Sequence, residues 1–225
     1  MTMFESTWLP KIPSDLVFGN PDLQDYVMMC VKHNRTPDHM LLFGPAGTGK
    51  TVTLKVLAAH FANSGMPLPP TIEQIPASLS ENEIIRRLTG AFETGTNDFA
   101  SPTWFLFDEF DRISKSQTQL KILMDIQTKA RIFATTNKIN VIETAMLNRF
   151  HSFEAKAPTS EDMLPRAKAI LQAELPEKTI PDGMILHGLE KCCRNSNGSL
   201  RDMMRSISGF IEYLQHKRSI NPWDV

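Results

Sequence analysis

One stretch of the chain, between residues 40 and 54, combines residue types suited to binding phosphate groups. Its sequence is MLLFGPAGTGKTVTL, in which Gly44, Gly49, Lys50 and Thr51 have the spacing G-x-x-x-x-G-K-[ST]. Glycines let a tight loop turn its backbone N–H groups inward, because no Cβ atom stands in the way. The lysine can reach the terminal phosphates, the threonine hydroxyl can ligate Mg²⁺, and the start of the helix adds a positive dipole end. We expect the phosphates to be surrounded by Gly44, Pro45, Ala46, Gly47, Thr48, Gly49, Lys50, Thr51 and Val52.

A pair of acids follows a second apolar run in the chain. Residues 104–107, WFLF, are followed directly by Asp108 and Glu109. In open α/β folds ligands bind at the carboxyl ends of the strands, so both acids are placed at that edge. Asp108 there suits Mg²⁺, bound mostly through water, and Glu109 can act as general base on an attacking water. The alternative is a solvated acidic turn, because Asp111 extends the charge run.

Three further polar residues occupy positions from which they can act on a phosphoryl group. Asn137 ends the run ARIFATTN and could hold a water, although asparagine also ends strands simply by turning. Arg149 lies in the short helical pattern at 144–150 that follows this run, and Arg201 begins the last helical pattern. Either arginine can stabilise charge on a transferring phosphoryl, Arg201 within the subunit and Arg149 in the neighbour's site. A surface salt bridge is the alternative for each arginine taken alone.

The remaining pattern predicts the elements that position these residues. Apolar runs that end in turns predict strands, and 3.6-residue periodicity predicts helices. Strands are expected in the run before Gly44 and at 71–75, 104–107 and 130–136; helices are expected at 21–32, from Thr51 to Gly65, and at 80–92, 117–129 and 144–150. Strands that alternate with helices indicate an α/β fold with a parallel sheet flanked by helices.

From residue 160 onward the periodicity is helical only. Helices are expected at 160–174, 182–194 and 198–217, separated by Pro176, Pro181 and the turn NSNG. We therefore place a domain boundary near residue 157, with an α/β domain at 1–157 and a small α-helical domain at 158–225. Residues 1–20, interrupted by Pro10 and Pro13, are expected to be an extended arm that belongs to the first domain.

Composition limits the classes of partner and compartment. With 225 residues and 41% hydrophobic residues the chain can bury a sizeable core, and its net charge of -1 gives no global signal for nucleic acid. Cys30, Cys192 and Cys193 form no C-x-x-C pair, which argues against a disulfide framework and a zinc site. No apolar run is long enough for a membrane span, and the N-terminus has no signal-peptide pattern. We expect a soluble cytoplasmic protein.

The ordered motifs GPAGTGKT, WFLFDEFD, ATTN, LNRF and GSLRDM resemble those of the AAA+ ATPases. They look most like the clamp-loader branch, which includes the replication factor C small subunits and the phage clamp-loader large subunit. The resemblance implies that the chain binds ATP and Mg²⁺. It makes Lys50 and Thr51 part of Walker A, Asp108 and Glu109 part of Walker B, and Asn137 sensor 1. It also carries Arg149 over as the arginine finger and Arg201 as sensor 2.

The N-terminal stretch STWLPKIPSDLVFGN is similar to the arm that lies against the adenine in that branch. Pro10, Leu16 and Val17 are therefore candidate base contacts. The resemblance covers essentially the whole chain, but the C-terminal collar helices of clamp loaders have no counterpart in this sequence. The finger motif is N-R-F, where that branch usually has S-R-C. Without a collar, assembly would rest on contacts between ATPase subunits, on DNA, or on a partner.

The family resemblance leaves several functions open. The leading one is a clamp-loader-like subunit that uses ATP to assemble on DNA with related AAA+ subunits and to load a sliding clamp. A helicase loader or a filament-forming transposition regulator is a second, and a non-hydrolysing nucleotide-dependent scaffold is a third. Basic residues that could contact DNA phosphates, or simply form solvated helix faces, are Arg86, Arg87, Arg112, Lys115 and Lys121.

Overall fold

A computed structural model of the chain describes residues 3–65, 68–76, 78–94, 101–113, 117–125, 130–196, 198–215 and 221–223. The chain divides into two compact units. The sheet unit consists of Asp22–Gly44 and Lys50–Glu154, and the helical unit consists of Met1–Pro21, Pro45–Gly49 and Ala155–Val225. The middle of the predicted phosphate loop, Pro45–Gly49, thus groups with the helical unit, and the lysine and threonine that follow it group with the sheet unit.

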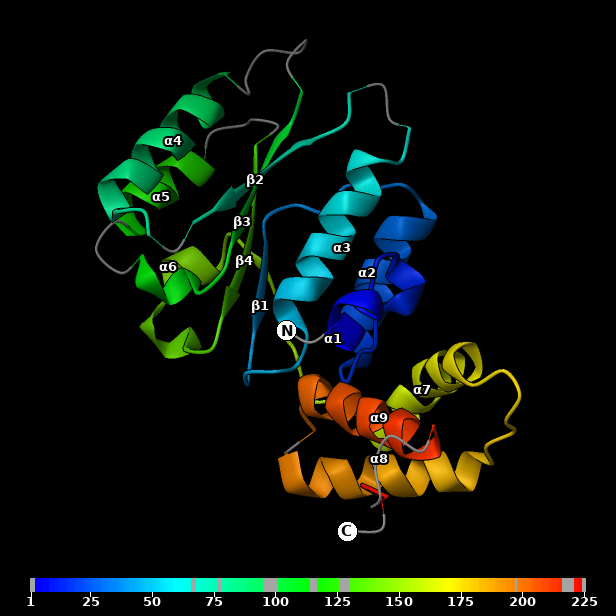
Figure 1. Cartoon of the computed structure of the whole chain (residues 1–225). Helices are drawn as coiled ribbons and strands as arrows, with labels where there is room; N and C mark the ends of the chain where they lie inside the picture. The colour runs from blue at the N-terminus through cyan, green and yellow to red at the C-terminus, as the bar shows by residue number, and fades with distance from the viewer. Residues whose placement is uncertain are drawn as a thin grey trace. The chain divides into compact units, whose positions relative to one another are not determined.

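In the described part of the sheet unit, five parallel strands have the order β2-β3-β4-β1-β5 (Figure 1). Their bounds are Met40–Phe43 for β1, Thr71–Ile75 for β2, Thr103–Phe107 for β3, Arg131–Thr136 for β4 and His151–Glu154 for β5. The register pairs Phe107 with Ala134 and Phe43 with Thr136. Because all strands run the same way, the segments that follow β1, β3 and β4 emerge at one edge of the sheet.

Helices cover both faces of this sheet. Figure 1 shows α4, α5 and α6 on one face, and α2 and α3 on the other. The bounds are Pro21–Lys32 for α2, Lys50–Ala62 for α3, Glu81–Thr94 for α4, Gln117–Met124 for α5 and Thr144–Leu147 for α6, with short 3-10 turns η2 at Phe110–Arg112 and η3 at Ile139–Val141. Parallel sheets need this double cover, since both faces of their strands are apolar. Residues Met40, Leu41 and Leu42 of β1 are accordingly fully buried.

The predicted α/β architecture is confirmed, with one strand missed and two helices shorter than expected. The strand β5 went unpredicted because its four residues, HSFE, are mostly exposed and carry almost no apolar signal. Pairing with β1 creates this strand, and Tyr26 of α2 packs on Phe153 with ring centroids 4.9 Å apart. The helix expected at 117–129 ends at Met124, with residues 126–129 outside the described part, and the helix expected at 144–150 ends at Leu147.

Directly before β1, His39 joins this strand to β4 through its side chain. Its Nδ1 atom accepts a hydrogen bond of 3.0 Å from the backbone N–H of Ile132, and its ring stacks on Phe92 at 6.0 Å. Burial, and then the nearby Arg131 charge, lower the pKa of His39 to about 4. The imidazole is therefore neutral at physiological pH and serves as an acceptor in the sheet.

The helical unit packs three long helices around an apolar core. They are α7 at Ser160–Glu174, α8 at Asp182–Ser196 and α9 at Leu200–Leu214. Thr159 caps α7 in a capping box with Asp162, and Ser199 caps α9 by accepting a bond from the Asp202 N–H. The core side chains are Met163, Ala167, Ile170, Leu171, Leu175, Ile185, Leu189, Met203, Ile207, Phe210, Ile211 and Trp223.

The expectation of an extended N-terminal arm is wrong in part. Residues Met3–Thr7 form the short helix α1, and Pro13–Asp15 form the 3-10 turn η1. The indole N–H of Trp8 donates to Glu174 at 2.7 Å, and Arg166 pairs with Asp15 at 2.6 Å. These tertiary contacts fold the arm against α7, and they group it with the helical unit rather than with the sheet.

None of the described helices is both long and apolar enough to span a membrane.

The neutral His39 predicts a loss of stability in mild acid. The unfolded chain takes up a proton near the usual pKa of 6.5, whereas the folded chain resists until about pH 4. Stability should therefore fall as pH drops from 6.5 to 4, by about 3 kcal/mol at most. Urea unfolding at several pH values should show this slope in the parent and lose it in His39→Gln. The exposed His33→Gln serves as control, and an unchanged slope in His39→Gln would contradict the assignment.

A second prediction concerns Gly188 of α8, over which the ring of Trp223 lies. A Cβ atom at Gly188 would overlap the indole, which itself stacks on Phe210 with centroids 3.6 Å apart. Gly188→Ala should therefore lower the free energy of unfolding by about 1–3 kcal/mol. Gly183→Ala, in the first turn of the same helix, meets nothing within 4 Å and should be neutral or stabilising by up to about 1 kcal/mol. Thermal unfolding of both variants measures the contrast, and equal effects would contradict it.

Candidate functional site

The predicted phosphate loop has a backbone that only glycines adopt easily. Gly44, Gly47 and Gly49 have φ values of 135°, 84° and 85°, and α3 begins immediately afterwards at Lys50. Positive φ is strained for residues with a Cβ atom, so these positions explain the glycine spacing physically. Within the loop, the Thr48 hydroxyl donates to the Pro45 carbonyl at 3.0 Å. The chain thus forms a tight loop that leads straight into a helix N-terminus.

The loop lysine lies at the base of this turn. Lys50 is buried, and its Nζ atom donates to the Gly44 carbonyl at 2.9 Å. Burial lowers the pKa of Lys50, and the nearby carboxylate of Asp108 partly opposes that shift. The ammonium is therefore desolvated and close to an acid, where an anionic phosphate would stabilise its charge.

One oxygen of Asp108 brings the two predicted motifs together. Asp108 Oδ1 accepts a hydrogen bond of 2.8 Å from the Thr51 hydroxyl of α3. The same oxygen accepts a bond of 2.6 Å from the Thr135 hydroxyl of β4. A hydroxyl and a carboxylate oxygen side by side are the hard ligands that Mg²⁺ prefers. Groups of three or more His, Cys, Asp or Glu that could hold a metal by themselves are absent from the described residues.

The neighbouring acid, Glu109, has an unusual backbone. Its φ of 60° and ψ of 57° lie in the left-handed region, which few residues other than glycine adopt. Such a conformation costs on the order of 1–3 kcal/mol and is often found at functional sites. The Glu109 side chain is exposed and makes no hydrogen bond or ion pair with any other described residue. Its carboxylate is therefore accessible to a water or a ligand.

Two threonines at the end of β4 hold these acids, and the sequence analysis did not single them out. The Thr135 hydroxyl donates to Asp108 and accepts a bond of 3.3 Å from the Glu109 N–H. The Thr136 hydroxyl donates to Asp111 at 2.8 Å. Both threonines are at most 2% exposed. The signal in the sequence was two hydroxyl residues within an otherwise apolar strand, next to the sheet edge.

The remaining predicted residues of the sheet unit lie in different settings. Asn137 is exposed directly after β4, at the sheet edge where Asp108 follows β3. Arg149 is bonded to Asp125, with Nη2 2.6 Å from Oδ2, and to the Ala145 carbonyl. The structure therefore brings Lys50, Thr51 and Asp108 together, whereas Arg149 is held by a different acid.

In the helical unit, the first turn of α9 packs on the phosphate loop. The Leu200 N–H donates to the Gly47 carbonyl at 3.0 Å, and Ser199 lies close enough that a Cβ atom at Gly47 would collide with its hydroxyl. Arg201, which is exposed, is the next residue of this turn. In the arm, Val17 packs against the helical core, and Pro10 and Leu16 are half-buried.

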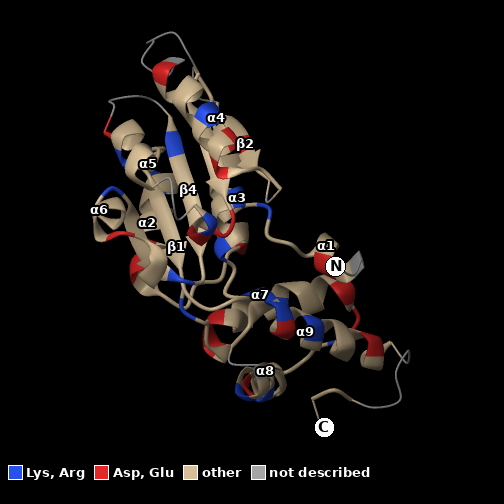
Figure 2. Ribbon diagram, turned by 90° about the vertical axis from the view of Figure 1, so that its left-hand side faces the viewer, with Lys and Arg blue, Asp and Glu red and all other residues tan. Residues whose placement is uncertain are grey.

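Two of the predicted DNA residues are paired with acids, and the others lie in different settings. Arg86 and Arg87 are exposed on α4, where Figure 2 shows basic and acidic positions mixed. Arg87 pairs with Glu73 at 3.1 Å and Lys121 with Glu143 at 2.7 Å. Arg112 is exposed in η2, and Lys115 lies outside the described residues.

The motifs and the fold agree with the comparisons. Residues 40–157 match the family model of the AAA proteins, the ATPase family associated with various cellular activities, and the chain belongs to this family. It is 28% identical to replication factor C subunit 3 of Oryza sativa subsp. japonica over 210 residues, covering 89% of this chain and 56% of that protein. It is 29% identical to replication factor C subunit 5 of Arabidopsis thaliana, covering 89% of this chain and 54% of that protein.

The chain thus resembles the replication factor C small subunits and spans a little over half of their length. Among solved structures, the RuvB Holliday junction branch migration motor of Thermotoga maritima matches with a TM-score of 0.64 at 18% identity. That match covers 96% of this chain and 70% of RuvB. At this identity the match supports the fold alone, in agreement with the sheet order and the P-loop.

The role of Thr135 in holding both acids leads to a matched pair of variants. Thr135→Val removes both hydroxyl bonds at constant volume and should lower stability by about 1–3 kcal/mol, because the Glu109 N–H loses its partner. It should also weaken Mg²⁺-dependent nucleotide binding several-fold, since Asp108 loses one of its two hydroxyl partners. Thr136→Val removes the Asp111 bond instead and should leave that Mg²⁺ dependence unchanged. Calorimetric titration with and without Mg²⁺ measures this, and equal changes in both variants would argue for a purely structural Thr135.

Proposed function

We propose that this chain is a Mg²⁺-dependent ATPase subunit that acts on DNA as part of a clamp-loader-like assembly. The observation that carries the ATPase part is the contact of Thr51 and Asp108 beside the desolvated Lys50. The resemblance to replication factor C subunits supports the clamp-loader part. The proposal divides the chain into an ATPase domain at 1–157 and a lid domain at 158–225.

The residues of the sheet unit would act on ATP as follows. Lys50 would bind the β- and γ-phosphates, and Thr51 and Asp108 would hold Mg²⁺, which neutralises the phosphate charge when bound. Glu109 would polarise the attacking water as general base, and Asn137 would orient that water. The exposed carboxylate of Glu109, which has no partner among the described residues, and its strained backbone support this role.

The two arginines would stabilise the charge on the transferring phosphoryl group. The first turn of α9 packs on the phosphate loop through Leu200, which supports a role of Arg201 within its own subunit. Arg149 would act in the site of a neighbouring subunit, because its contacts within the chain are with Asp125 and Ala145. Pro10, Leu16 and Val17 would contact the base. A site shared in this way couples ATP binding to assembly.

DNA and a sliding clamp are the proposed partners. Arg86, Arg87 and Arg112, which are exposed, would contact phosphates when several subunits surround DNA, and Lys115 and Lys121 would add to this track. The particle mass with a slowly hydrolysed ATP analogue, with and without primed DNA, tests the assembly. A closed or spiral particle of a few subunits supports a clamp loader, whereas a filament that lengthens with the DNA would instead favour a helicase loader or transposition regulator.

Glu109→Gln tests the hydrolytic step. The variant keeps the shape of the side chain and loses the base, so it should bind ATP as the parent does and hydrolyse it about 10² to 10⁴ times more slowly. Steady-state turnover and equilibrium ATP binding measure the two effects separately. Glu83→Gln on the exposed face of α4 is the control. A parent without turnover would instead indicate a nucleotide-dependent scaffold.

Mixing two inactive variants tests whether Arg149 acts on the neighbouring subunit. Arg149→Ala should keep ATP affinity and lose turnover by about 10³ to 10⁵. Mixed with Glu109→Gln, it should recover part of the turnover, since some shared sites then combine an intact Glu109 with an intact Arg149. Turnover of the mixture equal to the sum of the separate variants would contradict a shared site.

A further inference from the structure

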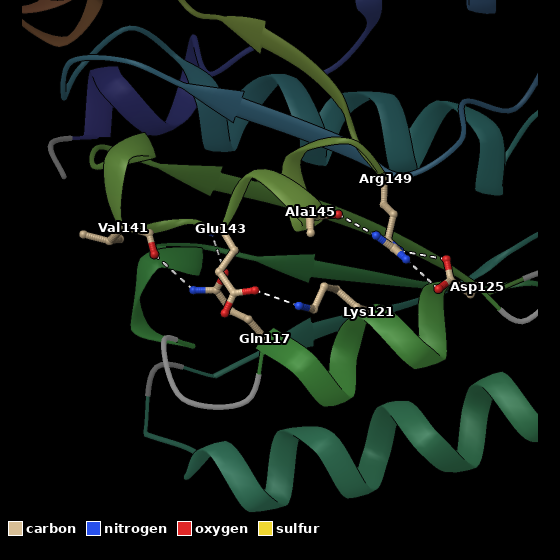
Figure 3. A network of polar contacts seen from close by, with 7 residues as sticks. All are labelled: Gln117, Lys121, Asp125, Val141, Glu143, Ala145 and Arg149. Atoms are coloured by element: carbon tan, nitrogen blue, oxygen red, sulfur yellow. Dashed lines mark hydrogen bonds and ion pairs between the residues drawn. The ribbon is translucent and has the colours of Figure 1, made fainter.

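Helix α5 is fastened to the segment between β4 and β5 by three polar side chains, four residues apart (Figure 3). Gln117 donates to the Val141 carbonyl at 3.1 Å and accepts from the Glu143 N–H at 2.8 Å. Lys121 donates to Glu143 at 2.7 Å. The third side chain, Asp125, follows the last helical residue and binds Arg149. Spacing by four places these side chains along one face of the helix.

The contact between Asp125 and Arg149 holds the guanidinium by one edge. Arg149 Nε is 2.8 Å from Asp125 Oδ1, and Nη2 is 2.6 Å from Oδ2, so the carboxylate binds the side of the guanidinium in a bidentate pair. Nη1 donates to the Ala145 carbonyl at 2.6 Å. Two rigid anchors thus hold a side chain that is otherwise long and flexible. The bond from Arg149 lowers the pKa of Asp125, so the pair is charged at physiological pH.

The contacts with Asp125 and Ala145 use only some of the N–H groups of the Arg149 guanidinium. A guanidinium has five N–H groups, and three of them are used by Asp125 and Ala145. The other two, one on Nη1 and one on Nη2, have no partner among the described residues. The Arg149 side chain is 28% exposed, so the guanidinium is held without being enclosed. Two N–H donors on adjacent nitrogens suit a phosphoryl oxygen as well as they suit a carboxylate.

We propose that Asp125 is a positioning residue for Arg149, which it holds by the Nε–Nη2 edge so that the remaining N–H groups meet a phosphoryl oxygen of ATP bound to a neighbouring subunit. This inference rests on the proposed function, because it needs Arg149 to act there. A surface arginine without such anchors loses rotamer entropy when it meets its ligand. Asp125 and Ala145 instead order the guanidinium before the subunits meet, and the aspartate directly follows helix α5.

Asp125→Asn tests the inference in the full-length chain. Asparagine has the same size but no charge and one acceptor oxygen fewer, so Arg149 loses its bidentate partner. Turnover in the assembled state should fall about 10- to 100-fold, with an unchanged KM for ATP, as expected for a misplaced catalytic group. Asp125→Glu keeps a bidentate carboxylate and should restore part of the rate. Glu143→Gln removes the neighbouring ion pair that Glu143 makes with Lys121 of α5, and it should change neither value.

A double variant separates positioning from other effects of Asp125. If Asp125 acts through Arg149, adding Asp125→Asn to Arg149→Ala should not lower turnover further. The Nε–H signal of Arg149 in an NMR spectrum of ¹⁵N-arginine protein should also exchange faster with water in Asp125→Asn. A further fall in the double variant would overturn the inference, and so would faster turnover in Asp125→Asn, which would mean that the aspartate restrains the arginine.

The outcomes also distinguish this inference from the proposed function. If Arg149→Ala turns over ATP as fast as the parent, the proposed role of Arg149 fails, and the positioning of Arg149 by Asp125 fails with it. If Arg149→Ala loses turnover while Asp125→Asn, folded as judged by thermal unfolding, keeps the parent rate, the positioning inference alone is overturned.

Discussion

The site depends on a single carboxylate oxygen that accepts two hydroxyl hydrogen bonds. Asp108 Oδ1 joins Thr51, at the start of α3, to Thr135, at the end of β4, and Asp108 itself follows β3. Three elements that are far apart in the sequence are therefore tied together at one atom. Because the carboxylate is oriented from two sides, its position relative to Lys50 and Thr51 is set before any ligand binds.

The parallel sheet makes this junction geometrically necessary. In a parallel sheet with this register, the segments that follow β1, β3 and β4 emerge at the same edge, and each of them contributes one polar feature. The first is the glycine loop, the second the pair of acids, and the third Asn137. Buried threonines occupy the last two positions of β4. An apolar residue in place of Thr135 would leave the Glu109 N–H without its acceptor. The buried ends of the strands and the polar residues of the site thus lie within a few residues of one another at the sheet edge.

The two predicted arginines lie in different units of the chain. Arg201 follows a turn whose backbone is bonded to the phosphate loop, within the helical unit. Arg149 is clamped by Asp125, within the sheet unit. Helix α5 begins a few residues after the acids of β3 and ends next to Asp125, so one short helix links the segment that carries Glu109 to the one that carries Arg149.

Much of this protein was determined by the sequence alone. The spacing of Gly44, Gly49, Lys50 and Thr51 predicted the phosphate loop, because positive φ and a following helix leave few alternatives to glycine. Apolar runs predicted β1, β3 and β4, and the acids after β3 were placed correctly at the sheet edge. These features are local: each depends on residues that lie next to one another in the chain. The shared motifs likewise sufficed to predict the family.

Only the tertiary structure decided the features that arise between distant segments. The strand β5 forms because it pairs with β1. The N-terminal arm folds against α7 because Trp8 and Asp15 bind Glu174 and Arg166 of that helix. Asp108 binds Thr135, 27 residues away, and Arg149 binds Asp125, 24 residues away. Neither of these two partners was assigned a role from the sequence. Hydrogen bonds of this kind depend on register and helix packing, and no local pattern of residue types encodes them.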